Sequence, residues 1–242
     1  MSLAEQQQLE ETYVMPTFGR KPVELVEGEG MVVRDDAGKE YLDFIAGIGA
    51  VSLGHCHPAV VRAITEQASM LIHVSNYYYI EHRGQVGKLL SDALNEDVPA
   101  ADQAPWQTFF ANSGAEANEC AIKAARKYSF DKYGEGRNTI VTLIQSFHGR
   151  TVTTLKATGQ EKFHQYFFPF TEGFAYAKAN DLADVTAKAD KTCCAVMMEM
   201  IQGEGGVLPL NKEFVQGVAK FCKENDILLI VDEVQTGIGR CG

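Results

Sequence analysis

The run Ile227-Leu228-Leu229-Ile230-Val231, followed directly by Asp232, decides the fold of this chain. Five consecutive apolar residues that end at a charged one are typical of a short strand buried on both faces. Such strands occur in parallel sheets that helices cover on either side. A carboxylate at the end of a buried strand is costly unless a partner compensates it, so Asp232 is the first candidate for a functional residue.

Upstream of this run, apolar strand patterns alternate with helical ones. The predicted strands are Gln107–Phe110, Thr139–Ile144, Cys193–Met198 and Ile227–Val231. One helix is predicted after Asn112-Ser113-Gly114, with one face made of Ala117, Cys120, Ala121, Ala124 and Tyr128. A second is predicted over Glu213–Asn225, with its inward face made of Phe214, Val218 and Phe221. This alternation predicts an α/β fold with a mostly parallel sheet, in which ligands bind beyond the carboxyl ends of the strands.

Residues 1–50 have a different character. Turn signals separate two short strand patterns, Met31–Arg34 and Glu40–Phe44. From Pro58 a helix is predicted, because proline suits the first turn and apolar residues follow at helical spacing. We therefore divide the chain into an N-terminal segment, residues 1–50, and a large domain, residues 51–242.

Composition excludes several classes of protein. The net charge of -10 argues against a nucleic-acid partner, which needs a basic face. No apolar run is long enough to span a bilayer, and the first residues lack the pattern of a secretory signal. Six cysteines without a CxxC pair, two of them adjacent in a strand pattern at Cys193 and Cys194, indicate buried thiols in a reducing cytoplasm. His55-Cys56-His57 is a poor metal site, because consecutive residues cannot all face one ion, and no metal is expected.

Ser113-Gly114-Ala115 lies between a predicted strand and a predicted helix. Free amides at a helix start, a hydroxyl and a glycine make a phosphate cradle. A plain helix cap is an equally good interpretation, with Ser113 as the N-cap and Glu116 completing a capping box.

Other candidates follow the next two strand patterns. After Ile144, Phe147 can stack on a flat ring and Arg150 can grip a carboxylate with its planar fork. After Met198, Glu199 and Glu204 lie in a glycine-rich loop, where a carboxylate can pair with a substrate amine or with Arg150. Each also has a plain structural interpretation: core packing for Phe147, a solvated charge for Arg150 and a polar loop for the glutamates.

Asp232 itself has three interpretations. A pyridinium nitrogen would be a suitable partner, because the negative charge keeps that nitrogen protonated and the ring a strong electron sink. A metal ligand or a helix N-cap would also explain an acidic residue here. A hydrolase triad of Ser113, His148 and Asp232 is disfavoured, because the chain has no GxSxG motif.

In their order along the chain, these sites resemble the class III, fold type I pyridoxal-phosphate aminotransferases, and among them the group of acetylornithine, ornithine and succinylornithine aminotransferases. The resemblance extends over essentially all 242 residues. The matching segments are Tyr41–Phe44 with Gly47-Ile48, Gly54–Pro58, His73–Asn76, Phe110–Glu119, Phe147–Thr151, Ala157–Lys162, Ile201–Gly206 and Asp232–Gly237.

The resemblance implies a role for each matching residue around pyridoxal 5'-phosphate. Ser113, Gly114 and Ala115 would bind the phosphate, and Phe147 would stack on the pyridine ring. Asp232 would pair with the ring nitrogen and Gln235 with the phenolic oxygen. His148 and Val234 complete the cofactor-binding set.

On the substrate side, the resemblance implies that Arg150 holds the α-carboxylate of the amino donor and of 2-oxoglutarate. Glu204 would pair with Arg150 and so switch the site between donor and acceptor. Asn76 and Tyr79 lie where substrate-side residues occur. The family also implies a homodimer with small-molecule substrates, in which residues 1–50 belong to a small α+β domain.

The reaction implied is a two-stage ping-pong transfer in arginine biosynthesis. The ω-amino group of N2-acetylornithine passes to the cofactor, giving N-acetylglutamate semialdehyde, and 2-oxoglutarate then takes the amine and leaves as glutamate. Ornithine, succinylornithine and 4-aminobutyrate are alternative donors.

Family members carry the lysine that holds the cofactor a few tens of residues after the aspartate that Asp232 matches. We therefore expect the 242-residue chain to be an inactive fragment, its large domain incomplete at the C-terminus, since Lys220 and Lys223 on the preceding helix are poor substitutes. Two other classes remain as alternatives: a non-catalytic protein that binds the cofactor or a partner, and a nucleotide-binding protein, which the missing GxGxxG motif disfavours.

Overall fold

The computed structural model describes residues 2–241 and divides them into two compact units. One unit runs to Tyr79 and includes Ile238–Arg240, and the other comprises Ile80–Gly237. The division after Tyr79 differs from the boundary at residue 50 that the sequence suggested, and the assignment of domains stays a prediction.

The first unit holds two helices and a small antiparallel sheet. Helix α1 (Leu3–Tyr13) begins at a capping box made by Ser2 and Glu5. The sheet has the order β1-β2-β3. Its strands are β1 (Leu25–Glu29), β2 (Val32–Asp35) and β3 (Glu40–Leu42). Strands β2 and β3 pair antiparallel, so the predicted hairpin is confirmed. Helix α2 (Pro58–Met70) starts at its proline, as predicted.

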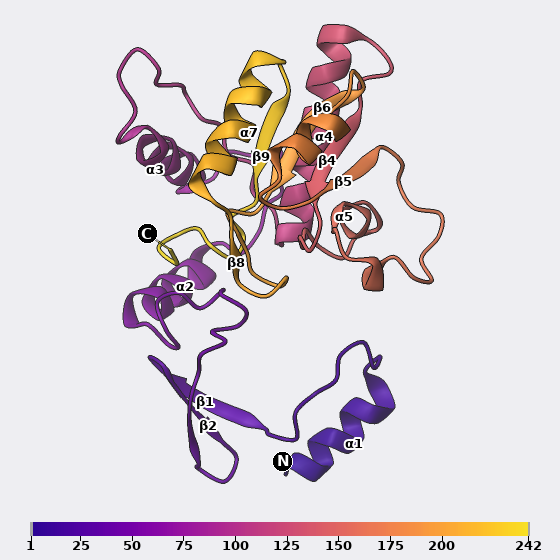
Figure 1. Ribbon diagram of the computed structural model, residues 1–242. Helices are drawn as coiled ribbons and strands as arrows, with labels where there is room; N and C mark the ends of the chain where they lie inside the picture. The colour runs from indigo at the N-terminus through magenta and orange to yellow at the C-terminus, as the bar shows by residue number, and fades with distance from the viewer. Residues whose placement is uncertain (1, 242) are drawn as a thin grey trace. The chain divides into compact units, whose positions relative to one another are not determined.

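The second unit is built on a four-stranded parallel sheet in the order β5-β4-β6-β9 (Figure 1). Its strands are β4 (Thr139–Leu143), β5 (Phe174–Ala177), β6 (Cys193–Met198) and β9 (Leu228–Val231). All six residues of β6 are buried, and Met198 pairs with Val231, so β6 and β9 end at the same level. The mostly parallel sheet predicted from the apolar runs is confirmed.

Helices cover both faces of this sheet. On one face Ile122 and Ala125 of α4 (Gly114–Tyr133) and Ala157 of α5 (Val152–Ala157) pack against the sheet. The other face is covered by α6 (Leu182–Lys188) and α7 (Lys212–Glu224). The core between these two helices and the sheet includes Val141, Leu143, Val185, Val196, Met198, Phe214, Val218 and Cys222. The inward face predicted for α7 is confirmed at Phe214 and Val218, whereas Phe221 is only partly buried.

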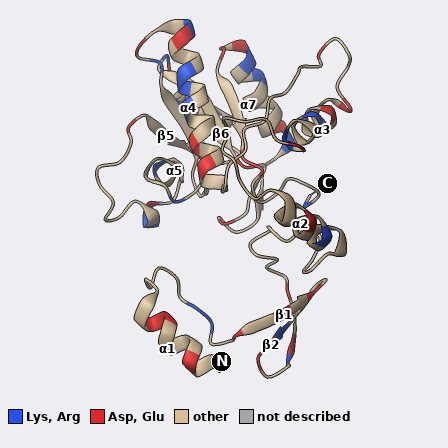
Figure 2. Cartoon of the chain, turned by 180° about the vertical axis from the view of Figure 1, so that it is seen from behind, with Lys and Arg blue, Asp and Glu red and all other residues tan. Residues whose placement is uncertain are grey.

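The remaining elements of this unit are short or peripheral. They are α3 (Arg83–Asn95), a 3-10 turn (Glu161–Phe163), β7 (Ile201–Gln202) and β8 (Leu208–Pro209). The outer faces of α4 and α7 carry charges of both signs, as Figure 2 shows, and Lys127 pairs with Asp131 on α4. Among residues 2–241 no helix has the length and apolarity to cross a membrane.

Two predictions about this unit are wrong. Gln107–Phe110 is not a strand, because a strand needs a hydrogen-bonded neighbour and this segment pairs with none in the described chain. The predicted face of α4 is also displaced: the buried residues are Asn118, Ile122, Ala125 and Ser129, while Ala124 and Tyr128 are exposed. The two polar members of the buried stripe are tolerated because their side chains are hydrogen-bonded.

Candidate functional site

Asp232 lies immediately after β9 and is 6% exposed. Its Oδ2 accepts a hydrogen bond from Asn118 Nδ2 at 2.8 Å and lies 2.8 Å from His148 Nδ1. Its Oδ1 accepts a hydrogen bond from the Val234 amide at 3.0 Å. These contacts join the end of β9 to helix α4 and to the loop after β4.

The partners of Asp232 decide its charge. Burial acts to raise its pKa, but the hydrogen bond and charge of His148, with the donors of Val234 and Asn118, outweigh burial and leave the pKa below its usual value. Asp232 is therefore a carboxylate, buried and ionised, at the carboxyl end of a parallel strand.

A second buried carboxylate, Glu199, lies beside it at the end of β6. It accepts hydrogen bonds from the amides of Phe147 at 2.9 Å and Gly203 at 3.3 Å. Burial raises the pKa of Glu199, and the hydrogen bonds do not offset that effect. Glu199 thus anchors the loop that carries Phe147 and His148.

The N-terminus of α4 lies next to this cluster. Ser113 is its N-cap and accepts a hydrogen bond from the Glu116 amide at 3.2 Å, so the capping interpretation is correct for Ser113. Glu116 does not close a capping box; its Oε2 accepts from the Asn112 amide at 2.6 Å instead. The first amides of the helix, those of Gly114 and Ala115, have no carbonyl of their own helix to bond, so capping and anion binding are compatible here.

Close packing brings the start of α4 against the other candidate residues. A Cβ on Gly114 would lie 2.7 Å from Val234 Cγ1. A Cβ on Gly149, whose φ is +130°, would lie 2.7 Å from the Cβ of Ala115. Glycine is therefore required at both positions, because a methyl group would push the segments after β9 and β4 away from the helix.

Phe147 and Arg150 follow β4 in this loop. The Phe147 ring is half-buried and packs edge-on against Phe163, with centroids 5.8 Å apart. Arg150 is exposed, and its guanidinium lies 5.8 Å from the centroid of Phe147. An aromatic face and a guanidinium thus lie within reach of each other, as stacking and carboxylate binding would need.

Glu204 and Gln235 approach from the other strand ends. Glu204 contacts Gln160 Nε2 at 2.6 Å and Lys162 Nζ at 3.4 Å. The side chain of Gln235 lies against Gly203, where an added Cβ would clash with Gln235 Oε1. The predicted pairing of Glu204 with Arg150 stays a prediction.

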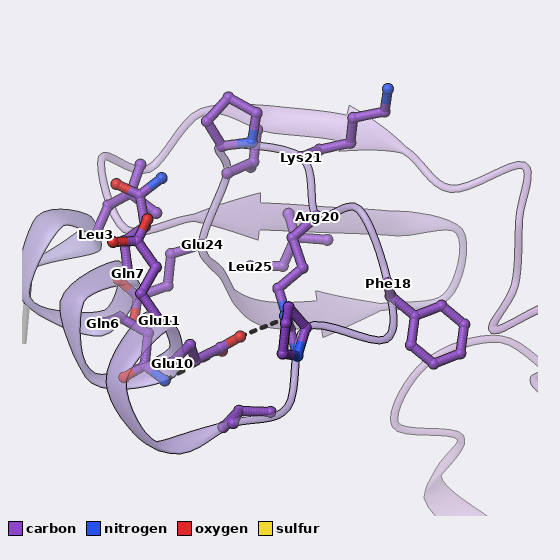
Figure 3. Close-up of a pocket in the computed structure, with 14 residues that line it drawn as sticks. Leu3, Gln6, Gln7, Glu10, Glu11, Phe18, Arg20, Lys21, Glu24 and Leu25 are labelled. Carbon is purple, nitrogen blue, oxygen red and sulfur yellow. Dashed lines mark hydrogen bonds and ion pairs between the residues drawn. The ribbon is translucent and has the colours of Figure 1, made fainter.

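Asn76 and Tyr79 belong to the first unit, whereas Asp232 belongs to the second. The same unit has a cavity of about 630 Å³ between α1 and the segment from Val14 to Leu25. Figure 3 shows the ion pair of Glu10 and Arg20 in its wall. The residues that line it include none of the predicted site residues.

Sequence reasoning missed Asn118, which donates to both Asp232 and the His148 carbonyl. A signal was present: Asn118, Ile122, Ala125 and Ser129 follow helical spacing, and a polar residue in a buried stripe indicates a specific partner.

The structure also bears on two alternative sites, a hydrolase triad and a metal site. His148 and Asp232 do pair, but Nε2 of His148 is buried without a hydrogen-bond partner, so Ser113 does not complete a triad. No group of three metal-ligating side chains is arranged to hold an ion in the part of the chain from residue 2 to residue 241.

The family model for aminotransferase class-III matches residues 15–242. The chain belongs to the class-III aminotransferases. Curated relatives of this class-III aminotransferase include the acetylornithine aminotransferase of Caldanaerobacter subterraneus subsp. tengcongensis, 51% identical over 96% of the chain and 57% of the relative. That of Haemophilus ducreyi is 49% identical over 97% of the chain and 58% of its own length. The chain thus spans little more than half the length of these relatives.

Solved structures agree with the fold. The ornithine aminotransferase of Toxoplasma gondii superposes with a TM-score of 0.88 at 30% identity, over 98% of this chain and 55% of that one. The acetylornithine aminotransferase of Elizabethkingia anophelis gives a TM-score of 0.79 at 32% identity, over 99% of this chain and 55% of that one. The predicted α/β fold of a pyridoxal-phosphate transferase is therefore confirmed.

Proposed function

We propose that this class-III aminotransferase binds pyridoxal 5'-phosphate with Asp232 as the partner of the pyridine nitrogen. The observation that carries the proposal is the state of Asp232: a buried carboxylate with a lowered pKa at a strand end. Oδ1 of this carboxylate accepts one hydrogen bond, from the Val234 amide, so it can take a further cationic N–H partner, and a protonated pyridine ring is one. A relative's structure, the Toxoplasma gondii ornithine aminotransferase, is described with pyridoxal phosphate at its active site.

The other candidate residues fit the same group. The amides of Gly114 and Ala115 with the Ser113 hydroxyl suit its phosphate, because a helix N-terminus favours an anion. Phe147 offers a half-buried aromatic face for the ring, while His148 and Val234 hold Asp232 and Gln235 offers an amide. When bound, the cofactor supplies the electron sink that lets an amine nitrogen change carbon partners.

We propose N2-acetylornithine as the amino donor and 2-oxoglutarate as the acceptor, with arginine biosynthesis as the setting. The names of relatives 46–51% identical to this chain support this donor. Arg150 would grip the α-carboxylate of either substrate, Glu204 would compensate Arg150 when no carboxylate is present, and Asn76 and Tyr79 would contact the donor. Ornithine is the second candidate donor, because an ornithine aminotransferase gives the TM-score of 0.88.

Cofactor binding is tested by titrating the purified chain with pyridoxal 5'-phosphate and following absorbance. Asp232→Asn keeps the shape but removes the charge, and we expect affinity to fall more than about tenfold, the range for a buried charged contact. Asp131→Asn, on the exposed face of α4, is the matched control. Absence of saturable binding by the wild type, or preference for a nucleotide, would contradict the proposal.

We infer further that residues 1–242 do not complete the amino transfer by themselves. The reaction needs an activated amine on the enzyme. Lys220 and Lys223 are exposed on α7, and Lys220 pairs with Glu224 at 3.8 Å. The test is to mix the chain with cofactor, 2-oxoglutarate and each candidate donor in turn, including succinylornithine and 4-aminobutyrate, and to measure glutamate. Glutamate formed at an enzyme-like rate would refute this inference. The donor that supports glutamate formation would then identify the substrate.

A homodimer in the cytoplasm completes the proposal. Six free cysteines suit a reducing compartment. Large apolar side chains are exposed on the first unit, such as Phe44, Ile72 and Tyr77, and apolar surface of this kind favours association. Light scattering on a sizing column measures the mass: twice the chain mass supports a dimer, and the mass of a single chain contradicts it for these 242 residues.

A further inference from the structure

Asn118 connects the parts of the site. It lies one turn into α4 and is 6% exposed, and its single amide group donates to His148 O at 2.9 Å and to Asp232 Oδ2 at 2.8 Å. Both hydrogens of the amide are therefore used. The residues it joins are 30 and 114 positions away in sequence.

The hydrogen-bonding capacity of Asp232 is used unevenly. Each carboxylate oxygen can accept about two hydrogen bonds. Oδ2 has two partners, Asn118 and His148, whereas Oδ1 has the Val234 amide. Oδ1 is thus the oxygen with capacity left for a ligand N–H, and Asn118 and His148 together fix which oxygen that is.

His148 is held in place by the same arrangement. Its amide donates to Thr158 Oγ1 at 2.9 Å, its carbonyl accepts from Asn118, and its ring nitrogen Nδ1 faces Asp232. The ring is fully buried and Nε2 has no hydrogen-bond partner, so the Asp232 contact is the polar contact that orients the ring.

We propose that Asn118 is a positioning residue for Asp232: the Asn118 amide holds that carboxylate so that its Oδ1 faces the ring nitrogen of the cofactor. This inference rests on the proposed cofactor site and deepens it. Without the Asn118 amide, Oδ2 would have one donor fewer. The Asp232 carboxylate could then rotate, and the position of each oxygen relative to His148 and the Val234 amide would no longer be fixed.

The test compares two ligands that differ at one atom: pyridoxal 5'-phosphate and its 1-deaza analogue, in which C–H replaces the ring nitrogen. We expect Asn118→Ala to weaken the first about tenfold, the range for a contact with a charged group, and to leave affinity for the analogue within about twofold. The matched control is Ser129→Ala, since Ser129 is buried on the same face of α4 and donates to Arg137 O, away from Asp232. Equal losses for both ligands, or no loss, would overturn the proposal.

A measurement without cofactor separates this proposal from the proposed function. In the unliganded chain, carbon-13 NMR follows the titration of the Asp232 carboxyl, and Asn118→Ala should raise its pKa because the charged form loses a donor. Ser129→Ala should not change it. If the wild type binds neither ligand, the proposed function fails for this chain, and an unchanged Asp232 pKa would still overturn the role of Asn118.

Asn118→Leu keeps the test valid if Asn118→Ala does not fold. Leucine has nearly the shape of asparagine but neither a donor nor a charge, so the same selective loss for pyridoxal 5'-phosphate is expected. Circular dichroism of each variant shows that the fold is retained before its affinities are compared.

Discussion

Two buried carboxylates at adjacent strand ends have pKa values that shift in opposite directions. Glu199 and Asp232 follow β6 and β9, which end level with each other. Burial dominates for Glu199, whose partners are two backbone amides, and its pKa rises. The imidazole and the amide of Asn118 reverse the outcome for Asp232. The kind of hydrogen-bond donor, more than the depth of burial, sets the direction in which each pKa shifts.

Glu199 should make stability depend on pH. Its native pKa lies above the unfolded value of about 4.3, so between these values the native state binds more protons than the unfolded state. The free energy of unfolding should therefore fall as pH rises through that window, whereas the contribution of Asp232 is lost only when pH falls below about 4.

Urea unfolding between pH 4.5 and 8 checks this prediction with Glu199→Gln, which should lack the decline. Glu135→Gln, in an exposed turn, is the control and should follow the wild type. A constant difference between wild type and Glu199→Gln at every pH would contradict the prediction.

Gly149→Ala should destabilise the chain by about 1–3 kcal/mol, because the added methyl group meets both Ala115 and Thr154. Gly136→Ala is the matched control: its φ is also positive, at +96°, but no atom lies within 4 Å of its added Cβ. Urea denaturation of both variants isolates the packing contribution. Equal losses would show that backbone strain alone explains the effect.

At the level of elements, α4 carries most of the connections of the site. Its buried stripe packs Ile122 against the sheet and places Asn118 beside Asp232. Ile122→Ala should cost about 2–5 kcal/mol of unfolding free energy, the range for large-to-small changes in a core. Lys123→Ala, one residue further and exposed, should change stability by less than about 0.5 kcal/mol. A loss below about 1 kcal/mol for Ile122→Ala would show that α4 is loosely packed.

The elements also show what the sequence can predict. The prediction for Cys193–Met198 matches β6 to the residue, because an unbroken apolar run is typical of a strand in a covered parallel sheet. Ile227–Val231 has the same pattern, yet β9 lies at the edge of the described sheet and is only partly buried. Gln107–Phe110 is a shorter pattern, two polar residues followed by two aromatic ones; it lacks a neighbouring strand, and pairing is not a local property. The positions of Asp232 and Ser113 followed from strand and helix ends, whereas the role of Asn118 depends on contacts 30 and 114 residues away.

At the level of the whole molecule, the two units differ in their cores. The buried apolar residues of the first unit are Val33 and Ala46, among residues that the structure describes, whereas those of the second unit form two clusters around the sheet. Local stability follows buried apolar contacts. Native-state hydrogen exchange should therefore protect β4 and β6 most and α1 and α2 least. Comparable protection of α1 and β6 would contradict this.

The sequence separation of the contacts around Asp232 has a consequence for biosynthesis. Ribosomes deliver Asn118 and His148 to the solvent long before Asp232, since 114 and 84 residues separate them from it. A nascent chain can thus assemble β4, β5 and β6 while the donors of Asn118 and His148 are still hydrated. The pairing of β9 with β6 extends the sheet and brings Asp232 to the donors of Asn118 and His148. Strand β9, which is translated after β4, β5 and β6, is therefore also the one that completes the polar cluster around Asp232.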